Sequence, residues 1–298
     1  YIKYERINGM IEIKNACKAY GAKAVLNNVE FTVKDGTIHG IIGENGSGKT
    51  TLIKCLTGIY RLNRGEILYD GHPVFENNAV KEQIGYVADS NQYFDNYSSK
   101  DMISFFKAAY TNFSEERFNE LNAIFNIDVN AKMKQLSKGQ GMRVAYMLNL
   151  ATFPKYLILD EPTSGLDPVA KKEFFDILVD EVEKRNMTVF ISSHHLNDLE
   201  KICDEITVIR NGRIIVNNDI DTVKNRVVKV QAVIEQKPEN LDIPGLIEFS
   251  NIGSIYTLVF KQFGDEEKAA LTVCGASFIE EIEVSLEEMF VYTNISGE

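Results

Sequence analysis

The sequence has no apolar run long enough to cross a membrane, for which about 20 consecutive apolar residues are needed. Its longest apolar candidates, Val144–Leu148 and Tyr156–Leu159, end at Asn149 and Asp160. The first residues contain no apolar stretch of the kind found in a secretory signal. We therefore expect neither a membrane-spanning segment nor a secretion signal in this sequence.

Cysteine and positive charge are also scarce. The four cysteines lie far apart and form no C-x-x-C pair, which favours reduced thiols over a disulfide framework or a zinc site. Lys and Arg number 32 against 43 Asp and Glu, a formal net charge of −11. Proteins that bind nucleic acid or anionic lipid present faces rich in Lys and Arg, so this balance argues against both classes.

Alternating strand-like and helix-like patterns fill residues 10–217. They surround a helical segment at about 90–153. Such alternation predicts an α/β fold with a mixed, mostly parallel sheet covered on both faces, here with an inserted helical subdomain. Residues 218–298 change to period-2 alternation and short helical patterns, which predicts a small α+β accessory domain. Residues 1–9 are either a foreign remnant or a short native extension.

A phosphate-binding loop lies between an apolar run, Ile38–Ile42, and a helical pattern, Thr51–Leu56. The loop matches G-x-x-x-x-G-K-[ST] and reads Gly43-Glu44-Asn45-Gly46-Ser47-Gly48-Lys49-Thr50. Its glycines let backbone N–H groups turn toward phosphates, Lys49 reaches the β- and γ-phosphates, and the Thr50 hydroxyl ligates Mg²⁺. The following helix directs its positive end at the same anion. The sequence therefore predicts a P-loop nucleotide-binding core.

Three further segments follow this loop in a fixed order. The first is Leu136-Ser137-Lys138-Gly139-Gln140, the second is Tyr156–Asp167 with Asp160-Glu161 inside it, and the third is Ile191-Ser192-Ser193-His194. Ser137 lies 88 positions after Lys49 and 23 before Asp160. The order and spacing of these motifs closely resemble the ATP-binding subunits of ABC transporters, over residues from about 11 to 217.

The resemblance implies ATP and Mg²⁺ as ligands and assigns the chemical roles. Glu161 resembles the general base for the attacking water, and His194 resembles the histidine that contacts the γ-phosphate. Asp160, at the end of an apolar strand, is expected to hold Mg²⁺ together with Thr50. Tyr20 resembles the aromatic residue that stacks on adenine, with a place in the core as the alternative. The implied nucleotide-binding residues are Tyr20, Gly43, Asn45, Gly46, Ser47, Gly48, Lys49, Thr50 and Thr51.

The segment around Ser137 has two compatible interpretations. Ser137 and Gln140 form an S-x-x-Q capping box at a helix start. In the family, this helix end faces the nucleotide held by the opposite subunit, which implies that Ser137, Gly139 and Gln140 bind ATP in trans. Lys138 departs from the glycine common at its position, and its charge could either attract phosphate or be solvated. Asp167 resembles the residue that couples the two sites.

A second departure lies in the segment 84–89. The family usually has a glutamine near position 89, where it contacts Mg²⁺ or water and senses the membrane partner. Here Asp89 stands there, and Gln92 is the nearest glutamine. Asp89 could meet a hydrated Mg²⁺ through its carboxylate. We expect a coupling role for this region, and the docking surface for a membrane subunit at 90–135. The aromatic residues Tyr93, Phe94 and Tyr97 are candidate contacts, with core packing as the alternative for at least one of them.

The resemblance implies an ATPase that works as a homodimer or heterodimer of ATPase subunits on a separate integral membrane subunit. The chain would then be cytoplasmic and peripheral on the inner face of the membrane. The ending Ser285–Phe290 resembles bacterial exporters of drugs or peptides, which favours export. The alternatives are an importer ATPase and a soluble ABC-type ATPase that acts on nucleic acid or the ribosome. No nucleic-acid partner is expected, because the net charge is negative.

Overall fold

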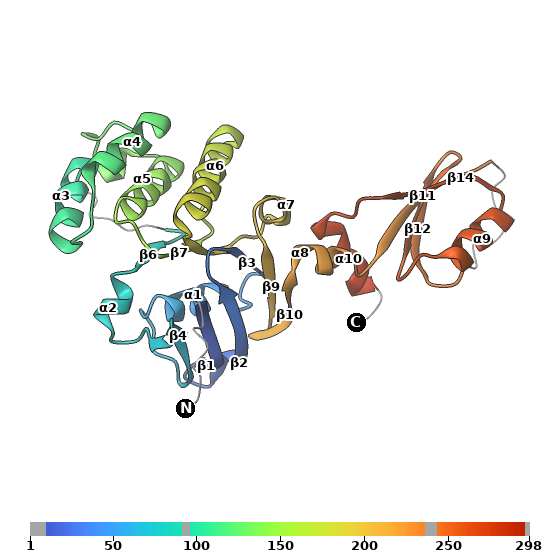
Figure 1. Ribbon diagram of the computed structural model, residues 1–298, viewed down its shortest axis with the longest axis horizontal. Coiled ribbons are helices and arrows are strands. Elements are labelled where there is room, and N and C mark those ends of the chain that lie inside the picture. Colours follow the sequence, from blue (N-terminus) through green and yellow to red (C-terminus); the bar gives the residue numbers. More distant parts are fainter. Residues whose placement is uncertain (1–9, 91–95, 236–242, 296–298) are drawn as a thin grey trace, which may run out of the picture. The chain divides into compact units, whose positions relative to one another are not determined.

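The computed structural model describes residues 10–90, 96–235 and 243–295, and the chain divides into two compact units (Figure 1). The first unit runs to His195 and resumes at Ile202–Asn217. The second unit comprises Leu196–Lys201 and the chain from Asn218 onward. The predicted first domain, 10–217, includes Leu196–Lys201, whereas the structure groups this segment with the second unit.

An antiparallel sheet opens the first unit, with strand order β2-β1-β4-β5. Its strands are β1 (Met10–Tyr20), β2 (Lys23–Lys34), β4 (Arg64–Tyr69) and β5 (His72–Pro73). β1 and β2 form a hairpin in which Tyr20 pairs with Lys23. Buried residues alternate with exposed ones along β2, as expected for a sheet with one face on the core.

A second sheet of six strands has the order β10-β9-β3-β8-β7-β6. Its strands are β3 (Ile38–Ile42), β6 (Ile84–Val87), β7 (Tyr156–Asp160), β8 (Thr188–Ser192), β9 (Glu205–Arg210) and β10 (Arg213–Asp219). β3, β7 and β8 are parallel, and Ser192 lies opposite both Ile41 and Asp160. The carboxyl ends of these strands therefore meet at one edge, where ligands bind in open α/β sheets.

Helix α1 (Lys49–Leu56) lies in the core between the two sheets. Its Leu52, Ile53 and Leu56 are fully buried in one cluster with Ile13 of β1 and Ile158 of β7. Because α1 packs against both sheets, the position of the loop that precedes it is fixed. The mixed-sheet P-loop core predicted from the sequence is confirmed.

The inserted helices are α2 (Asn78–Lys81), α3 (Ser99–Ala109), α4 (Glu115–Phe125), a 3₁₀ turn (Met133–Gln135) and α5 (Lys138–Leu150). Ser98 and Ser114 cap α3 and α4 through their side-chain oxygens. Phe105 of α3 and Ile124 of α4 are about half exposed. Helix α6 (Pro168–Arg185) packs on α5.

The second unit is built on a four-stranded sheet of order β12-β13-β11-β14. Its elements are α7 (Leu196–Glu200), α8 (Ile220–Lys224), β11 (Val228–Ile234), β12 (Leu246–Ile252), β13 (Ile255–Phe260), α9 (Asp265–Val273), β14 (Ala276–Ile282) and α10 (Leu286–Ile295). Leu271 of α9 is buried with Val230, Leu258 and Phe260.

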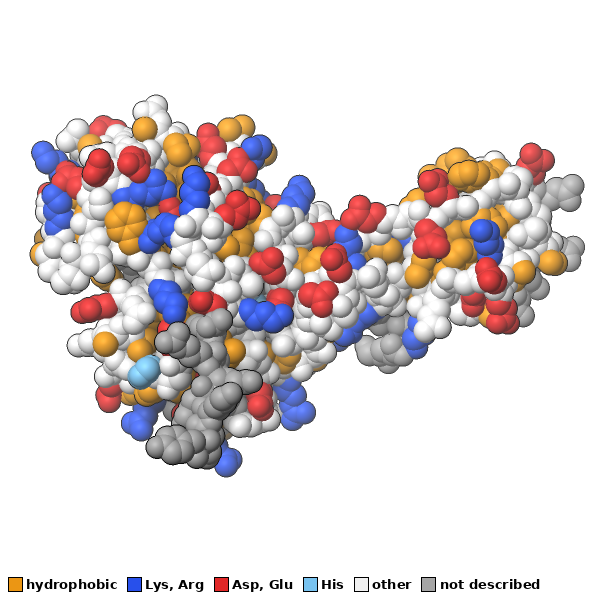
Figure 2. All heavy atoms as spheres, in the orientation of Figure 1, with side chains coloured by type: hydrophobic (Ala, Val, Ile, Leu, Met, Phe, Trp, Pro, Cys, Tyr) orange, Lys and Arg blue, Asp and Glu red, His pale blue; other side chains and the backbone are white. Residues whose placement is uncertain are grey.

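Charge of both signs is spread over the surface. On the face of the first unit that Figure 2 shows, Lys and Arg side chains are interspersed with Asp and Glu. No helix in the described part of the chain has the length and apolarity needed to cross a membrane.

Glu200 holds α7 within the second unit. Its carboxylate accepts hydrogen bonds from Lys224 Nζ at 2.8 Å and from the Leu286 backbone N–H at 2.9 Å. Because both charged side chains are mostly buried, we expect Glu200→Ala to cost about 1–3 kcal/mol of stability in this unit. Urea denaturation and hydrogen exchange at α8 and α10 measure the loss. Glu283→Ala removes an exposed carboxylate from the same lysine, and a comparable loss there would contradict this role for Glu200.

Candidate functional site

The loop of residues 43–48 depends on glycine for its backbone conformation and for its close packing. Gly46 and Gly48 have φ angles of 83° and 116°, in the left-handed region that glycine tolerates. A Cβ on Gly43 would lie 2.4 Å from the Ile209 carbonyl oxygen. The loop is therefore wrapped closely against β9, which fixes where its backbone N–H groups lie.

Two buried polar side chains, Ser47 in this loop and Lys49 directly after it, are available to bind an anion. The Lys49 side chain is buried, and its ammonium donates to the carbonyl oxygens of Gly43 at 2.5 Å and Glu44 at 3.3 Å. The Ser47 hydroxyl is buried and has no hydrogen-bond partner among the described residues. A buried hydroxyl without a partner costs free energy. The loop is thus suited to an anionic ligand that supplies acceptors.

A cavity of about 330 Å³ opens beside this loop, a volume within the usual range of ligand pockets. It is lined by Lys23, Val25, Glu44, Asn45, Gly46, Gly48, Lys49, Thr50, Thr51, Asp89 and Glu161. Of the predicted nucleotide-binding residues, Tyr20, Gly43 and Ser47 do not line it. Lys23 and Val25 were missed by sequence reasoning, because they reach the cavity through the β1–β2 hairpin and belong to no motif.

Asp160 ends β7 as a buried carboxylate. Ser192 Oγ donates to its Oδ1 at 2.8 Å. Burial raises the pKa of Asp160, hydrogen bonds from Ser192 and Thr50 lower it, and the nearby charges of Glu161 and Asp89 raise it further. No cluster of three or more His, Cys, Asp or Glu within the described ranges could hold a metal by itself. A lone carboxylate and a hydroxyl suit Mg²⁺, which uses few protein ligands and completes its shell with water and phosphate.

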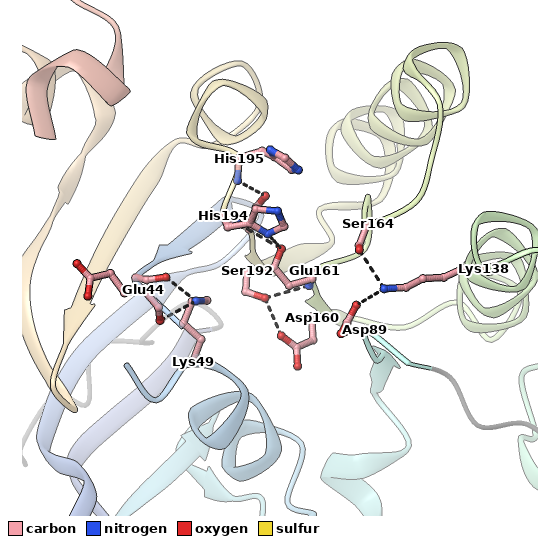
Figure 3. A network of polar contacts seen from close by, with 12 residues as sticks. Glu44, Lys49, Asp89, Lys138, Asp160, Glu161, Ser164, Ser192, His194 and His195 are labelled. Carbon is pink, nitrogen blue, oxygen red and sulfur yellow. Dashed lines mark hydrogen bonds and ion pairs between the residues drawn. The ribbon is translucent and has the colours of Figure 1, made fainter. Parts of the chain in front are cut away.

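Glu161 and His194 form a pair at the next position along the sheet edge (Figure 3). His194 Nδ1 lies 2.7 Å from Glu161 Oε2, and the His194 backbone N–H donates to the same oxygen at 3.3 Å. An ionised carboxylate only accepts, so Nδ1 carries the proton. Glu161 has a φ of 50°, a strained conformation for this residue type, and its N–H donates to Ser192 Oγ at 3.0 Å. The carboxylate is therefore held in one orientation.

Tyr20 lies at the surface, where 47% of it is exposed, so the core alternative does not hold. Its ring meets Tyr60 edge-on at 6.1 Å between centroids, and Lys18 Nζ lies 5.6 Å from its centroid. The exposed ring is available for stacking, although it stands outside the cavity lining.

Ser137 caps α5 as the sequence predicts. Its Oγ accepts from the Gln140 N–H at 3.2 Å, and Gln140 Oε1 accepts from the Ser137 N–H at 2.9 Å. Gly139 is buried, and a Cβ there would lie 2.6 Å from the Gly165 carbonyl oxygen. The start of α5 is therefore packed closely on the turn that follows Glu161.

The remaining predicted coupling residues differ in their surroundings. Asp167 caps α6 by accepting from the backbone N–H groups of Val169 and Ala170, each at 3.0 Å. These bonds, that of Ala170 first, lower the pKa of Asp167. Asp89 lines the cavity and is paired with Lys138 Nζ at 2.8 Å. Gln92, Tyr93 and Phe94 lie outside the described residues, and Tyr97 is exposed at the surface.

We predict that Asp160→Asn stabilises the nucleotide-free protein at pH 7. Because its folded-state pKa is raised above the unfolded value, ionised Asp160 destabilises the fold above both pKa values, and Asn removes that cost. Asn keeps an acceptor for Ser192. Thermal midpoints measure the gain, which should shrink as pH falls toward the usual Asp pKa. Mg²⁺ and ATP together should raise the midpoint of the wild type more than that of the variant, which lacks the carboxylate for Mg²⁺. A nucleotide-free variant less stable than wild type would contradict this assignment.

The loop, the buried aspartate and the Glu–His pair at one sheet edge define a P-loop nucleotide-binding protein. The family described as ABC transporter matches residues 26–164. The ABC transporter ATP-binding protein YtrB of Bacillus subtilis is 31% identical, over 95% of this chain and 97% of its own length. The chain belongs to the ABC transporter ATP-binding family. ATP binding and hydrolysis are the activities that this family implies.

Among other relatives, some names state a direction of transport and some do not. The lantibiotic transport ATP-binding protein SrtF of Streptococcus pyogenes is 34% identical, over 72% of this chain and 93% of its own. The methionine import ATP-binding protein MetN of Protochlamydia amoebophila is 29% identical, over 72% and 68%. A solved structure of an ATP-binding subunit of an ABC transporter has a TM-score of 0.67 at 26% identity, covering 72% of this chain and 92% of that one. Names alone therefore do not fix the direction.

Proposed function

We propose that this chain hydrolyses ATP in the cavity beside residues 43–48 and drives export by a separate membrane subunit. The observation that carries the catalytic proposal is the convergence of Lys49, Thr50, Asp160 and the Glu161–His194 pair at one edge of the sheet. No single motif supplies these groups. They come from the ends of three neighbouring strands, β3, β8 and β7. Catalysis of phosphoryl transfer to water depends on positioning such groups around the phosphate.

The residues divide the work between binding and chemistry. The loop amides and Lys49, whose ammonium exchanges its carbonyl partners for phosphate oxygens, hold the β- and γ-phosphates. Thr50 and Asp160 hold Mg²⁺, which when bound neutralises charge on the phosphates. Glu161 accepts the proton of the attacking water, and His194 keeps that carboxylate oriented.

Two ATPase subunits complete each site in this proposal, as a homodimer or a heterodimer. The capped N-terminus of α5, with Ser137, Gly139 and Gln140, presents backbone N–H groups and positive helix-dipole charge suited to a phosphate. It would act on the nucleotide of the opposite subunit. Asp167, which fixes the start of α6 directly after the Glu161 turn, is placed to couple the two sites.

The likeness to SrtF, whose name states lantibiotic transport, supports a peptide as the cargo. Export is supported by the resemblance of the ending Ser285–Phe290 to bacterial exporters. The membrane subunit would dock on the helical insert and the Asp89 region, with this chain on the cytoplasmic side. Import is the second candidate, which the likeness to MetN favours. A nucleic-acid partner is disfavoured by the net charge of −11 and by the mixing of Lys and Arg with Asp and Glu on the face that Figure 2 shows.

Reconstitution tests the whole proposal. Genes for candidate membrane subunits are coexpressed with the tagged chain, the complex that co-purifies is placed in inside-out vesicles, and ATP is added outside. Accumulation of an amphipathic peptide or drug inside the vesicles is the expected result. ATP-dependent movement in the opposite direction would replace export with import, and co-purification with ribosomes alone would contradict a transport role.

A further inference from the structure

Lys138, the first residue of α5, joins two segments that border the nucleotide cavity. Its ammonium donates to Asp89 Oδ1 at 2.8 Å and to Ser164 Oγ at 3.0 Å. Asp89 follows β6, and Ser164 lies in the turn after Glu161. In Figure 3 the Lys138 side chain extends from α5 toward both oxygens. Because Ser137 caps the helix, the residue after it has a fixed starting direction.

The Asp89 carboxylate, which pairs with Lys138, lies in a cavity where a negative charge would repel phosphate. Asp89 lines the same cavity as Lys49, Thr50 and Glu161. Glu161 adds a second carboxylate to this lining, and the buried Asp160 lies beside it. A triphosphate would bring several more negative charges. An ionised carboxylate can only accept hydrogen bonds, so Asp89 offers a phosphate oxygen no donor and repels it unless a cation neutralises its charge.

Two other lysines, Lys23 and Lys49, line this cavity. The ion pair with Asp89 is formed by a third lysine, Lys138. Lys49 Nζ is bonded to the carbonyl oxygens of Gly43 and Glu44 and is the group that phosphate needs. Lys138 supplies the ion pair to Asp89, with the two side chains 51% and 49% exposed. Two unusual residues of the sequence, 49 positions apart, are thus partners in space.

We propose that Lys138 is a positioning residue that neutralises Asp89 and so lets the cavity accept a nucleoside triphosphate. It acts through Asp89 rather than on the phosphates of its own subunit, and its bond to Ser164 ties the start of α5 to the turn after Glu161. The inference rests on the proposed nucleotide site. The side chains at 89 and 138 therefore form one functional unit, in which the cation is needed only because the carboxylate is present.

A double-mutant cycle tests this dependence. Affinity for ATP with Mg²⁺ is measured by isothermal titration calorimetry on purified wild type, Lys138→Met, Asp89→Asn and the double variant. Lys138→Met should bind about tenfold more weakly, as expected for one uncompensated charge near a polyanion. Asp89→Asn should bind ATP up to about tenfold more tightly than wild type, because it leaves the Lys138 ammonium uncompensated near the polyanion. The double variant should stay within about threefold of wild type, because no carboxylate then needs a counterion. Lys138→Arg, which keeps the charge, should restore most of the affinity.

Lys134 provides the matched control. Its ammonium bonds the Asn96 side chain at 3.0 Å, away from the cavity, so Lys134→Met removes the same charge without exposing a carboxylate to ATP. Its affinity should equal that of wild type. Circular dichroism measures whether each variant is folded. We expect that all are, because the substituted side chains are exposed.

Two results would overturn the inference while leaving the nucleotide site intact. One is wild-type affinity in Lys138→Met. The other is a double variant as weak as Lys138→Met, which would mean that Lys138 contacts the phosphates itself. Failure of the folded wild-type protein to bind ATP would overturn the proposed function and, with it, this inference.

Discussion

Glu161→Gln is expected to lower ATP turnover by about 10²–10⁴-fold, the usual contribution of a general base. The amide cannot accept the proton of the attacking water at neutral pH. It still offers an oxygen to the His194 backbone N–H, which now donates to Glu161 Oε2. ATP affinity should therefore be kept, and the loss should fall on turnover rather than on binding. Phosphate release and calorimetric ATP titration measure the two separately.

Glu183→Gln is the control for this change, since it removes one exposed carboxylate from α6. Its turnover should match that of wild type. In the Glu161 variant, ATP that is bound but not hydrolysed should also hold two subunits together, which gel filtration with and without ATP detects. Turnover close to wild type in Glu161→Gln would remove Glu161 from the role of base.

The strand ends that build the site could be predicted because each motif is local. The apolar run Ile38–Ile42, the glycines after it and the acidic pair at the end of the run Tyr156–Leu159 need no distant information. A parallel sheet then places such strand ends at one edge. The pairing of Asp160 with Ser192, which aligns the catalytic pair, comes from the register and follows from no motif.

Contacts between distant segments could not be predicted. Lys138 and Asp89 each appeared as an isolated departure, and only the fold brings the two side chains together. Lys23 reaches the cavity because the hairpin folds back. Each such contact depends on the summed geometry of several elements, whereas residue spacing reports on one helix or strand.

The second unit shows a different limit of prediction from sequence, which concerns the choice of the buried face of a strand. Period-2 alternation at Ile255, Thr257 and Val259 correctly indicates a strand, β13. The residues on the other face of β13 lie in the core of this unit: Tyr256, Leu258 and Phe260. Ile255 is 46% exposed. Both faces of the strand carry apolar side chains, so alternation could not tell which face is buried.

Gly139→Ala is expected to reduce ATP turnover by about 100-fold, although only one methyl group is added. The new Cβ would lie 2.6 Å from the Gly165 carbonyl oxygen, and backbone at that distance must move. The start of α5 would then shift from the turn that follows Glu161. A displacement of about 1 Å can cost about 100-fold in rate when groups must be aligned. Phosphate release measures the turnover.

Gly141→Ala offers a control on the same helix, because no atom lies within 4 Å of the Cβ it would add. Alanine favours a helix over glycine by about 1 kcal/mol, so this variant should be at least as stable as wild type and equally active. In Gly139→Ala, ATP binding to one subunit should survive, since the residues 43–50 are untouched, while ATP-dependent dimerisation is lost. Equal turnover in the two variants would show that the start of α5 is not part of the working site, and the trans assignment of Ser137, Gly139 and Gln140 would fall with it.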